Sequence, residues 1–267
     1  MTDIPTGQLT VPTRLGVSAT YIDGLMTLEL TPRPETLHHG IVRASVLSFV
    51  IDAQAGILLD QDPSSWTLTT DMTVRMRPSP APQLVRASCT TLREGRRSAT
   101  SLVELFSDDG SHLATGAIGF ARVPRKATDP PKPAVTPADT PKLFRDRGTL
   151  ARPLREEAGI EVIDAAEGIV QVDVTPALRN PAGTLQGAMV ALLAEAAVED
   201  LVATRFESPV VVTELDIRYL GQAQVGPVRT RSRLLGTGPD APAQVELIDT
   251  STDKITTLVY ARAVAVP

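Results

Sequence analysis

The sequence predicts an α+β protein made of two similar halves, each with one long helix packed against a curled antiparallel sheet. A proline-rich segment divides the 267-residue chain near its middle, and the two flanking segments repeat the same order of patterns. In each flank, a strand with alternating apolar residues precedes a nearly uninterrupted apolar helix, and about four strands follow it. A helix that is apolar on almost every side must be covered on almost every side, so the sheet should wrap around it.

The proline-rich segment sets the predicted domain boundaries. It reads "VPRKATDPPKPAVTPADTPK" and contains little that could be buried, which is typical of a stiff, exposed linker. We therefore predict an N-terminal domain over residues 1–124, a linker over residues 125–143 and a C-terminal domain over residues 144–267.

The two halves match element by element. Their first strands read "GLMTLELTP" and "GIVQVDVTP", and a Thr-Pro pair ends each strand. Helices are predicted over residues 41–59 and 188–205, with Thr36 and Thr184 as candidate N-caps. The next strands contain "TDMTVRM" and "TELDIRYL", and three further strands with turn signals complete each half.

Each predicted helix carries a carboxylate inside its apolar run. Asp52 lies in "VLSFVIDAQAGILL" and Glu195 in "MVALLAEAAVEDLV". Burying an unpaired carboxylate is costly, so both side chains should face a crevice. A structural alternative also stands, because Glu195 and Glu199 share one helix face and could line a solvated edge.

The segment "NPAGTLQGAMVALLAE" resembles the loop-helix motif of hotdog-fold acyl-CoA thioesterases, in their PaaI-like and 4-hydroxybenzoyl-CoA thioesterase-like forms. That motif has an Asn, a short spacer, Gly-Thr-Leu-His-Gly-Gly, and an acid eight residues after the first Gly of the pair. Asn180, Gly187 and Glu195 fit it, whereas Gln186 and Ala188 depart from it. Because the pattern occurs in both halves, the resemblance implies a tandem double hotdog whose halves form a pseudo-dimer.

The resemblance also implies two sites between the halves, because in single-domain relatives one subunit supplies the loop and the other the acid. The first site would combine residues of both halves, namely Asp52, Thr69 or Thr70, Asn180, Gln186 and Gly187. The second would combine His38, His39 and Gly40 with Glu195. The loop of the second site is shorter and has no counterpart of Asn180, so we predict that the first site is the active one.

The spacing of the motif leaves one ambiguity. Asp52 precedes Thr70 by as many residues as Glu195 precedes Thr213. Counted forward from the Thr-Leu pairs, however, the first half has extra residues. We place them before Asp52, because "VIDAQ" and "LAEAA" are alike. If they followed it, Asp52 would lie about one turn too far along the helix.

The resemblance implies thioester hydrolysis to a free acid and CoA. The N–H of Gly187, at the positive end of the helix dipole, would hold the oxyanion. Asp52 would act as general base on water or attack directly, and both roles stay open. Asn180 and Thr69 or Thr70 would orient the acid or the water. Thiolate is a good leaving group, so no metal or cofactor is expected, and coenzyme A enters only as part of the substrate.

Composition excludes several classes of partner, metal site and location. A net charge of −5 argues against a nucleic-acid partner, and the single Cys89 excludes an internal disulfide or a cysteine zinc cluster. The N-terminus lacks signal-peptide features, and no apolar run approaches the ~20 residues that span a membrane, so we expect a cytoplasmic protein. Exposed sheet edges suggest a homo-oligomer of the double unit.

Two alternative functions stay open at this stage. A hotdog hydratase or dehydratase would pair His38 or His39 with Glu195, although the local patterns typical of those enzymes are absent. A non-catalytic acyl-CoA-binding protein would keep the fold and lose the chemistry.

Overall fold

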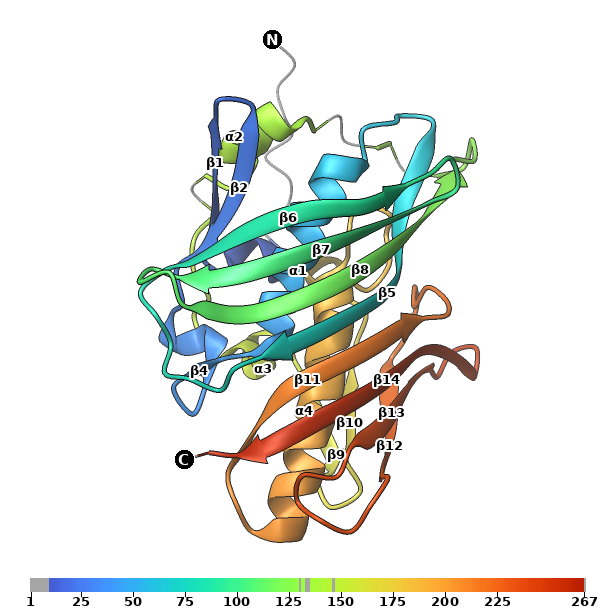
Figure 1. The fold of residues 1–267 in the computed structure, drawn as a ribbon. Helices are drawn as coiled ribbons and strands as arrows, with labels where there is room; N and C mark the ends of the chain where they lie inside the picture. Colours follow the sequence, from blue (N-terminus) through green and yellow to red (C-terminus); the bar gives the residue numbers. More distant parts are fainter. Residues whose placement is uncertain (1–9, 130, 133–134, 146, 267) are drawn as a thin grey trace.

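The computed structural model describes residues 10–129, 131–132, 135–145 and 147–266. Its main feature is a twelve-stranded antiparallel sheet that curves around two long helices (Figure 1). The first half contains η1 (Pro12–Arg14), β1 (Val17–Ile22), β2 (Leu25–Leu30), η2 (Pro34–Thr36), β3 (Leu37–His38), β4 (Ile41–Val42), α1 (Ala44–Leu59), β5 (Ser65–Met76), β6 (Val85–Glu94), β7 (Ser98–Ser107) and β8 (His112–Pro124).

The second half has the same plan. It contains η3 (Pro137–Asp139), α2 (Thr140–Leu143), α3 (Leu154–Glu157), β9 (Glu161–Asp164), β10 (Ile169–Val172), η4 (Pro176–Leu178), α4 (Gly187–Phe206), β11 (Val210–Tyr219), β12 (Val228–Leu234), β13 (Ala243–Asp249) and β14 (Lys254–Ala265). Within the described residues, no helix has the length and apolarity needed to cross a membrane.

The strand order reveals an internal two-fold relation. Outward from the central β5–β11 pair, one side runs β8, β7, β6, β2, β1 and the other runs β14, β13, β12, β10, β9. Thr73 pairs with Asp216 across the centre, and these two residues are 143 positions apart. The same offset relates the irregularity between Thr69 and Asp71 in β5 to the one between Val212 and Glu214 in β11. In the long helices and the central strands, each residue of the first half therefore has a counterpart 143 positions later.

The offset resolves the ambiguity left by the sequence. α1 begins at Ala44 and α4 at Gly187, so Asp52 and Glu195 occupy the same position in their helices. The extra residues of the first half lie before α1, in the short β3–β4 hairpin. The placement of these residues before Asp52 is thus confirmed.

The predicted N-caps are wrong. Thr36 ends the short helix η2, where its hydroxyl accepts a hydrogen bond from the Arg33 N–H at 3.1 Å. The residues at the N-cap positions of the long helices are Arg43 and Gln186, and the Gln186 side chain accepts a hydrogen bond from the Ala188 N–H at 2.6 Å. The error arose because a hairpin or a loop separates each threonine from its helix.

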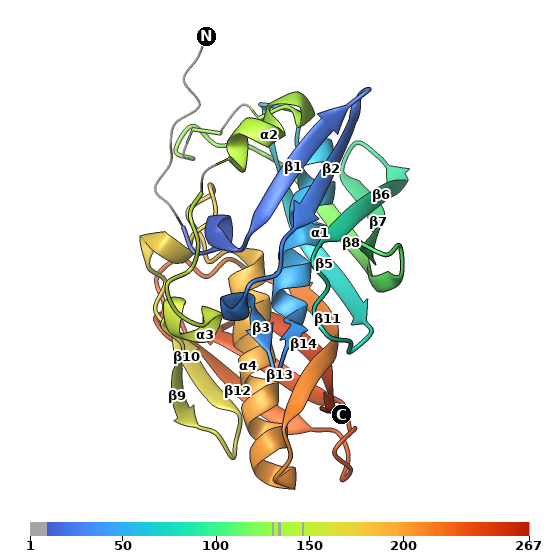
Figure 2. The same cartoon turned by 90° about the vertical axis from the view of Figure 1, so that its left-hand side faces the viewer.

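The segment after β8 is not the fully exposed linker that its composition predicts. Lys132 donates hydrogen bonds to Asp60 Oδ1 at 2.7 Å and to the Ser65 carbonyl at 2.8 Å, and Thr140 is fully buried. α2 packs against β1 of the first half (Figure 2). A lysine can lay its methylene stem along apolar surface while its ammonium finds acceptors, which composition alone does not reveal.

Candidate functional site

Asp52 and Thr69 form the centre of the candidate site. Asp52 lies in the middle of α1 and Thr69 lies in β5, immediately before the irregularity in that strand. The Thr69 hydroxyl donates a hydrogen bond to Asp52 Oδ1 at 2.7 Å. Burial raises the pKa of Asp52, and the Thr69 hydrogen bond partly counteracts that rise. The carboxylate is therefore held in one orientation but remains a stronger base than an exposed aspartate.

The first residue of α4 approaches Asp52 from the other half of the chain. A methyl group added to Gly187 would lie 3.8 Å from Asp52 Oδ2 and 3.2 Å from the Tyr219 hydroxyl. No acceptor for the Gly187 N–H is found among the described residues. A free N–H at the positive end of a helix dipole, beside a carboxylate, is suited to binding a developing negative charge.

Tyr219 is a member of the site that the sequence analysis missed. Its hydroxyl donates a hydrogen bond to the Gly187 carbonyl at 3.2 Å. Burial raises the pKa of Tyr219, and the charge of Asp52 raises it further. Tyr219 therefore stays neutral and fixes the first turn of α4 against the end of β11.

Asn180 stabilises the loop before α4 through hydrogen bonds to the backbone of the same loop. The Asn180 side-chain oxygen accepts a hydrogen bond from the Thr184 N–H at 3.1 Å, and the Asn180 carbonyl accepts one from the Gly183 N–H at 2.9 Å. Gly183 has a positive φ of 84°, which favours glycine in this tight turn. The Asn180 amide nitrogen has no partner among the described residues and is the group left to contact a ligand.

Several of the predicted residues line one cavity of about 360 Å³. Asp52, Thr69, Asn180 and Gln186 all border it, together with apolar side chains of both halves. Thr70 does not join them, because its hydroxyl donates to Asp71 Oδ2 at 2.8 Å. The structure thus separates the two threonines that the sequence left as alternatives, and Thr69 is the one that contacts the acid.

The second predicted site is built differently, because Glu195 binds the start of α1 directly. Glu195 is buried and accepts hydrogen bonds from the Ala44 N–H at 2.8 Å and from the Ser45 hydroxyl at 2.5 Å. Ala44 is the counterpart of Gly187, so here the acid occupies the N–H that is free in the first site. Glutamate is one methylene longer than aspartate, which lets it reach the helix terminus.

Arg43 fills the remaining space of the second site. It is the counterpart of Gln186, and its guanidinium lies 2.9 Å from Glu199 Oε2 and 3.6 Å from Glu195 Oε2. Arg155 lies 3.9 Å from Glu199 and pairs with Asp200 at 2.7 Å. In this buried cluster, Glu199 and Asp200 each contact an arginine, so the acids and arginines balance one another's charge within the protein.

The predicted binding residues of the first-half loop lie around this cluster. His38 Nδ1 is 3.3 Å from Arg43, and its Nε2 is 3.6 Å from Glu199. Burial and the charge of Arg43 lower the pKa of His38 to about 3, so it is neutral. His39 and Gly40 form the exposed tip of the β3–β4 hairpin, with φ of 50° and 76°. The structure does not bring either of them to Glu195.

No protein-family model matches the sequence, and no curated protein matches it. Solved structures do match. A putative oleoyl thioesterase from Lactobacillus plantarum gives a TM-score of 0.63 at 14% identity, covering 95% of this chain and 99% of that one. A conserved protein with a hotdog fold from Alicyclobacillus acidocaldarius gives 0.62 at 14% identity, covering 96% and 98%. The chain has the hotdog fold.

A third match is a putative thioesterase II from Thermobifida fusca YX. It gives a TM-score of 0.61 at 16% identity, covering 96% of this chain and 97% of that one. The hotdog likeness therefore extends over both halves of the chain. At these identities the likeness establishes the fold, and the chemistry must be argued from the residues of the site.

Proposed function

We propose that this protein is an acyl-CoA thioesterase with one working site, formed between two hotdog units that act as a pseudo-dimer. One observation carries the proposal: the Thr69-bound carboxylate of Asp52 borders a cavity lined by both halves and lies beside Gly187, whose N–H has no acceptor among the described residues. The solved structures of the same fold that are described as thioesterases support the same reaction class.

The chemistry follows from the positions of these groups. The thioester carbonyl oxygen binds the Gly187 N–H, and Asp52 removes a proton from a water molecule that attacks the carbonyl carbon. The tetrahedral intermediate carries its negative charge on the oxygen held by Gly187. The C–S bond then breaks, CoA leaves as the thiolate, and the proton on Asp52 returns to it. The Asn180 amide orients the water, and Tyr219 keeps the start of α4 in place.

Direct attack by Asp52 on the carbonyl is the second form of the same proposal. It would give a mixed anhydride that water then opens, with the same products. Hydrolysis in ¹⁸O-labelled water under single-turnover conditions separates the two forms. Water activated by a general base puts one labelled oxygen into every product acid, whereas direct attack, with water opening the anhydride at the Asp52 carbonyl, gives an acid without label in the first turnover and leaves the label on Asp52.

The hydratase alternative has weaker support from the geometry. It needs a histidine and an acid facing one substrate, whereas His38 contacts Arg43 and Glu199 and is held neutral. The second site also has Arg43 in the place where the first site has Gln186.

The test of the proposal is CoA release from acyl-CoAs of increasing chain length and from an aryl-CoA, monitored with a thiol reagent. Turnover above the buffer rate is expected. In a parallel assay, hydration of a 2-enoyl-CoA is monitored through the loss of its ultraviolet absorbance. Hydration without CoA release would establish the hydratase, and binding without either reaction would leave an acyl-CoA-binding protein.

Adding a methyl group to Gly187 is expected to block the site, with only a small shift of the Tyr219 ring to accommodate it. In Gly187→Ala, the new methyl lies 3.2 Å from the Tyr219 hydroxyl and takes the space beside Asp52. Alanine keeps the backbone N–H, but its methyl occupies the space through which an oxyanion would approach. We therefore expect kcat/KM to fall by about 100-fold, as large a loss as when an oxyanion donor is removed, with a cooperative thermal unfolding transition retained. Gly221→Ala is the control, because its added methyl meets only ordinary contacts. Equal activity of both variants would contradict this role of Gly187.

Removing the Thr69 hydroxyl is expected to move the pH profile. The Thr69 hydrogen bond lowers the pKa of Asp52, so in Thr69→Val that pKa rises further. A base works only when deprotonated, so the acidic limb of kcat/KM against pH should shift to higher pH. Thr70→Val is the control, because Thr70 binds Asp71 instead. A limb that stays in place would show that Asp52 is not the titrating base.

Self-association of the double unit and a cytoplasmic location stay predictions. Light scattering tests the first, because a dimer or trimer would give a multiple of the chain's mass of 28.4 kDa.

A further inference from the structure

The cavity that contains Asp52 continues along one face of α1. Asp52, Ala53, Gly56, Ile57 and Asp60 line it, and their spacing is that of a single helix face. A second cavity of about 220 Å³ borders the first, since Gly56, Ile57 and Asp60 line both. Together they form a groove of about 12 Å from Asp52 to Asp60, at a helical rise of ~1.5 Å per residue.

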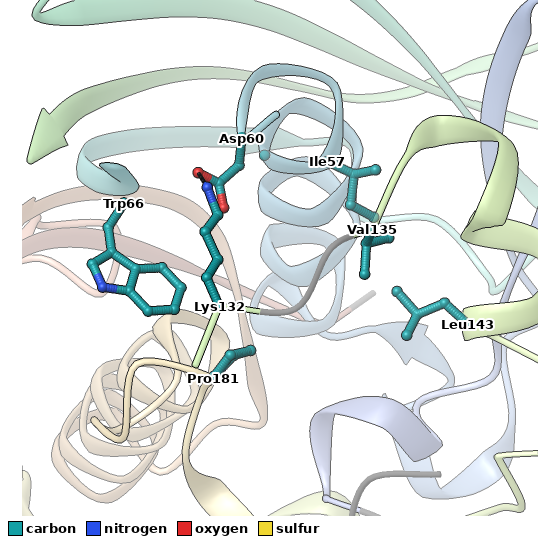
Figure 3. A pocket seen from close by; sticks show the side chains of 8 residues that line it. Ile57, Asp60, Trp66, Lys132, Val135, Leu143 and Pro181 are labelled. Atoms are coloured by element: carbon teal, nitrogen blue, oxygen red, sulfur yellow. Dashed lines mark hydrogen bonds and ion pairs between the residues drawn. The ribbon is translucent and has the colours of Figure 1, made fainter. Parts of the chain in front are cut away.

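Between Asp52 and Asp60, the walls of this groove are mostly apolar. Phe49 comes from α1, and its ring packs edge-on against Phe144 with centroids 6.5 Å apart. Leu68 and Phe120 come from the sheet, and Leu143 comes from the segment that follows the N-terminal half. Figure 3 shows Ile57, Val135 and Leu143 gathered on one side of the groove.

A fixed polar contact lines the far end of the groove. Lys132 forms an ion pair with Asp60 beside the Trp66 ring (Figure 3). Its ammonium also donates to the carbonyls of Asp62 and Ser65 at 2.7 and 2.8 Å. The lysine ammonium therefore has three acceptors of its own and is not a group awaiting a ligand.

The matching face of α4 is filled by charges. The counterparts of Gly56 and Ile57 are Glu199 and Asp200, which pair with Arg43 and Arg155. At Gly56, by contrast, an added methyl group would meet no atom within 4 Å. The same helix face is thus filled by charged side chains in one half and open in the other. The open face begins at Asp52, which lies beside Gly187.

We propose that this groove binds the acyl chain of the substrate, and that the substrate is a straight aliphatic thioester of medium length. This inference rests on the proposed function. An extended chain advances about 1.2 Å per bond, as a polypeptide residue with three backbone bonds spans ~3.3–3.6 Å. The groove therefore accepts on the order of ten carbons between Asp52 and the Lys132–Asp60 pair.

Gly56→Leu tests the proposal by placing a side chain halfway along the groove. In the wild type, each methylene added up to about ten carbons should raise kcat/KM by about fourfold, the equivalent of ~0.8 kcal/mol per buried methylene. In Gly56→Leu, kcat/KM for decanoyl-CoA should fall by about 100-fold, while that for butyryl-CoA changes by less than about threefold. Glycine is a poor helix former, so this variant should fold at least as well as the wild type.

Thr204→Leu is the matched control, because it adds the same side chain at an exposed position of α4. It should keep the wild-type ratio of decanoyl to butyryl turnover. An unchanged ratio in Gly56→Leu, or no gain in the wild type from four to ten carbons, would overturn the proposal.

A binding measurement keeps the inference separate from the proposed reaction. The non-hydrolysable thioethers S-decyl-CoA and S-butyl-CoA are titrated calorimetrically into both variants and the wild type. Tighter binding of the decyl compound that is lost only in Gly56→Leu would support the groove even if no acyl-CoA is hydrolysed. Equal binding of decyl and butyl compounds by the wild type would reject the groove whatever the turnover.

Discussion

Asp52→Asn is expected to reduce kcat for acyl-CoA hydrolysis by about 1,000-fold and to leave KM nearly unchanged. Asparagine keeps the shape of the side chain and can still accept the Thr69 hydrogen bond, which measures 2.7 Å in the wild type. It cannot take a proton from water, and a positioned general base contributes about 10²- to 10⁴-fold. Steady-state CoA release at saturating and limiting substrate separates the two parameters.

The control for this variant is Asp253→Asn. Asp253 is exposed and has a φ of 52°, a conformation that asparagine also tolerates. It should retain wild-type kcat. Retention of most activity by Asp52→Asn, with loss in Glu195→Gln, would instead assign the reaction to the second site. Thermal unfolding of each variant distinguishes a lost base from a lost fold, because Glu195 also binds the start of α1.

The sequence anticipated the elements that depend on a repeated pattern. The two apolar helices, each with one acid, follow from their composition, and α1 and α4 do carry Asp52 and Glu195 at equivalent positions. The loop with Asn180 and Gly187 was recognisable because it resembles the loop-helix motif of hotdog-fold thioesterases.

The sequence did not reveal residues that reach the site through the fold. Tyr219 lies at the end of β11, and nothing in its neighbours indicates that its hydroxyl meets the Gly187 carbonyl. The same holds for Arg43, whose position before α1 follows from the hairpin that precedes it. Lys132 was assigned to an exposed linker because its composition matches one, whereas three acceptors near the end of α1 hold it.

Arg43→Met is expected to destabilise the protein by about 3–5 kcal/mol at pH 9. The substitution removes the cation that lies within 2.9–3.0 Å of both Glu199 oxygens and leaves buried carboxylates without it. Breaking a buried ion pair from one side costs about this much, because the remaining charge stays desolvated. The shift of the urea midpoint, with Arg205→Met as an exposed control, measures the loss.

The loss should depend on pH in a definite direction. Burial raises the pKa of Glu199 to about 8, and the charge of Glu195 adds to that rise while Arg43 opposes it. A carboxyl whose pKa is raised by folding favours the folded state at low pH, and this contribution is lost as pH rises through the folded pKa. Without Arg43 the pKa rises further, so Glu199 is neutral at pH 6 and the variant should lose less stability there than at pH 9.

A double variant tests whether the cluster of Arg43 and Glu199 has a purely structural role. Arg43→Met with Glu199→Met removes the cation and the acid together, and apolar groups of similar size replace them. Because replacing both partners of a buried pair is often neutral, the double variant should regain much of the stability at pH 9. If it does, and if turnover by the Asp52 site persists in both variants, the second site is structural and the chain hydrolyses its substrate at one place. If the double variant is less stable than the single one at pH 9, the stability of the cluster depends on Arg155 and Glu195 rather than on the pair of Arg43 with Glu199.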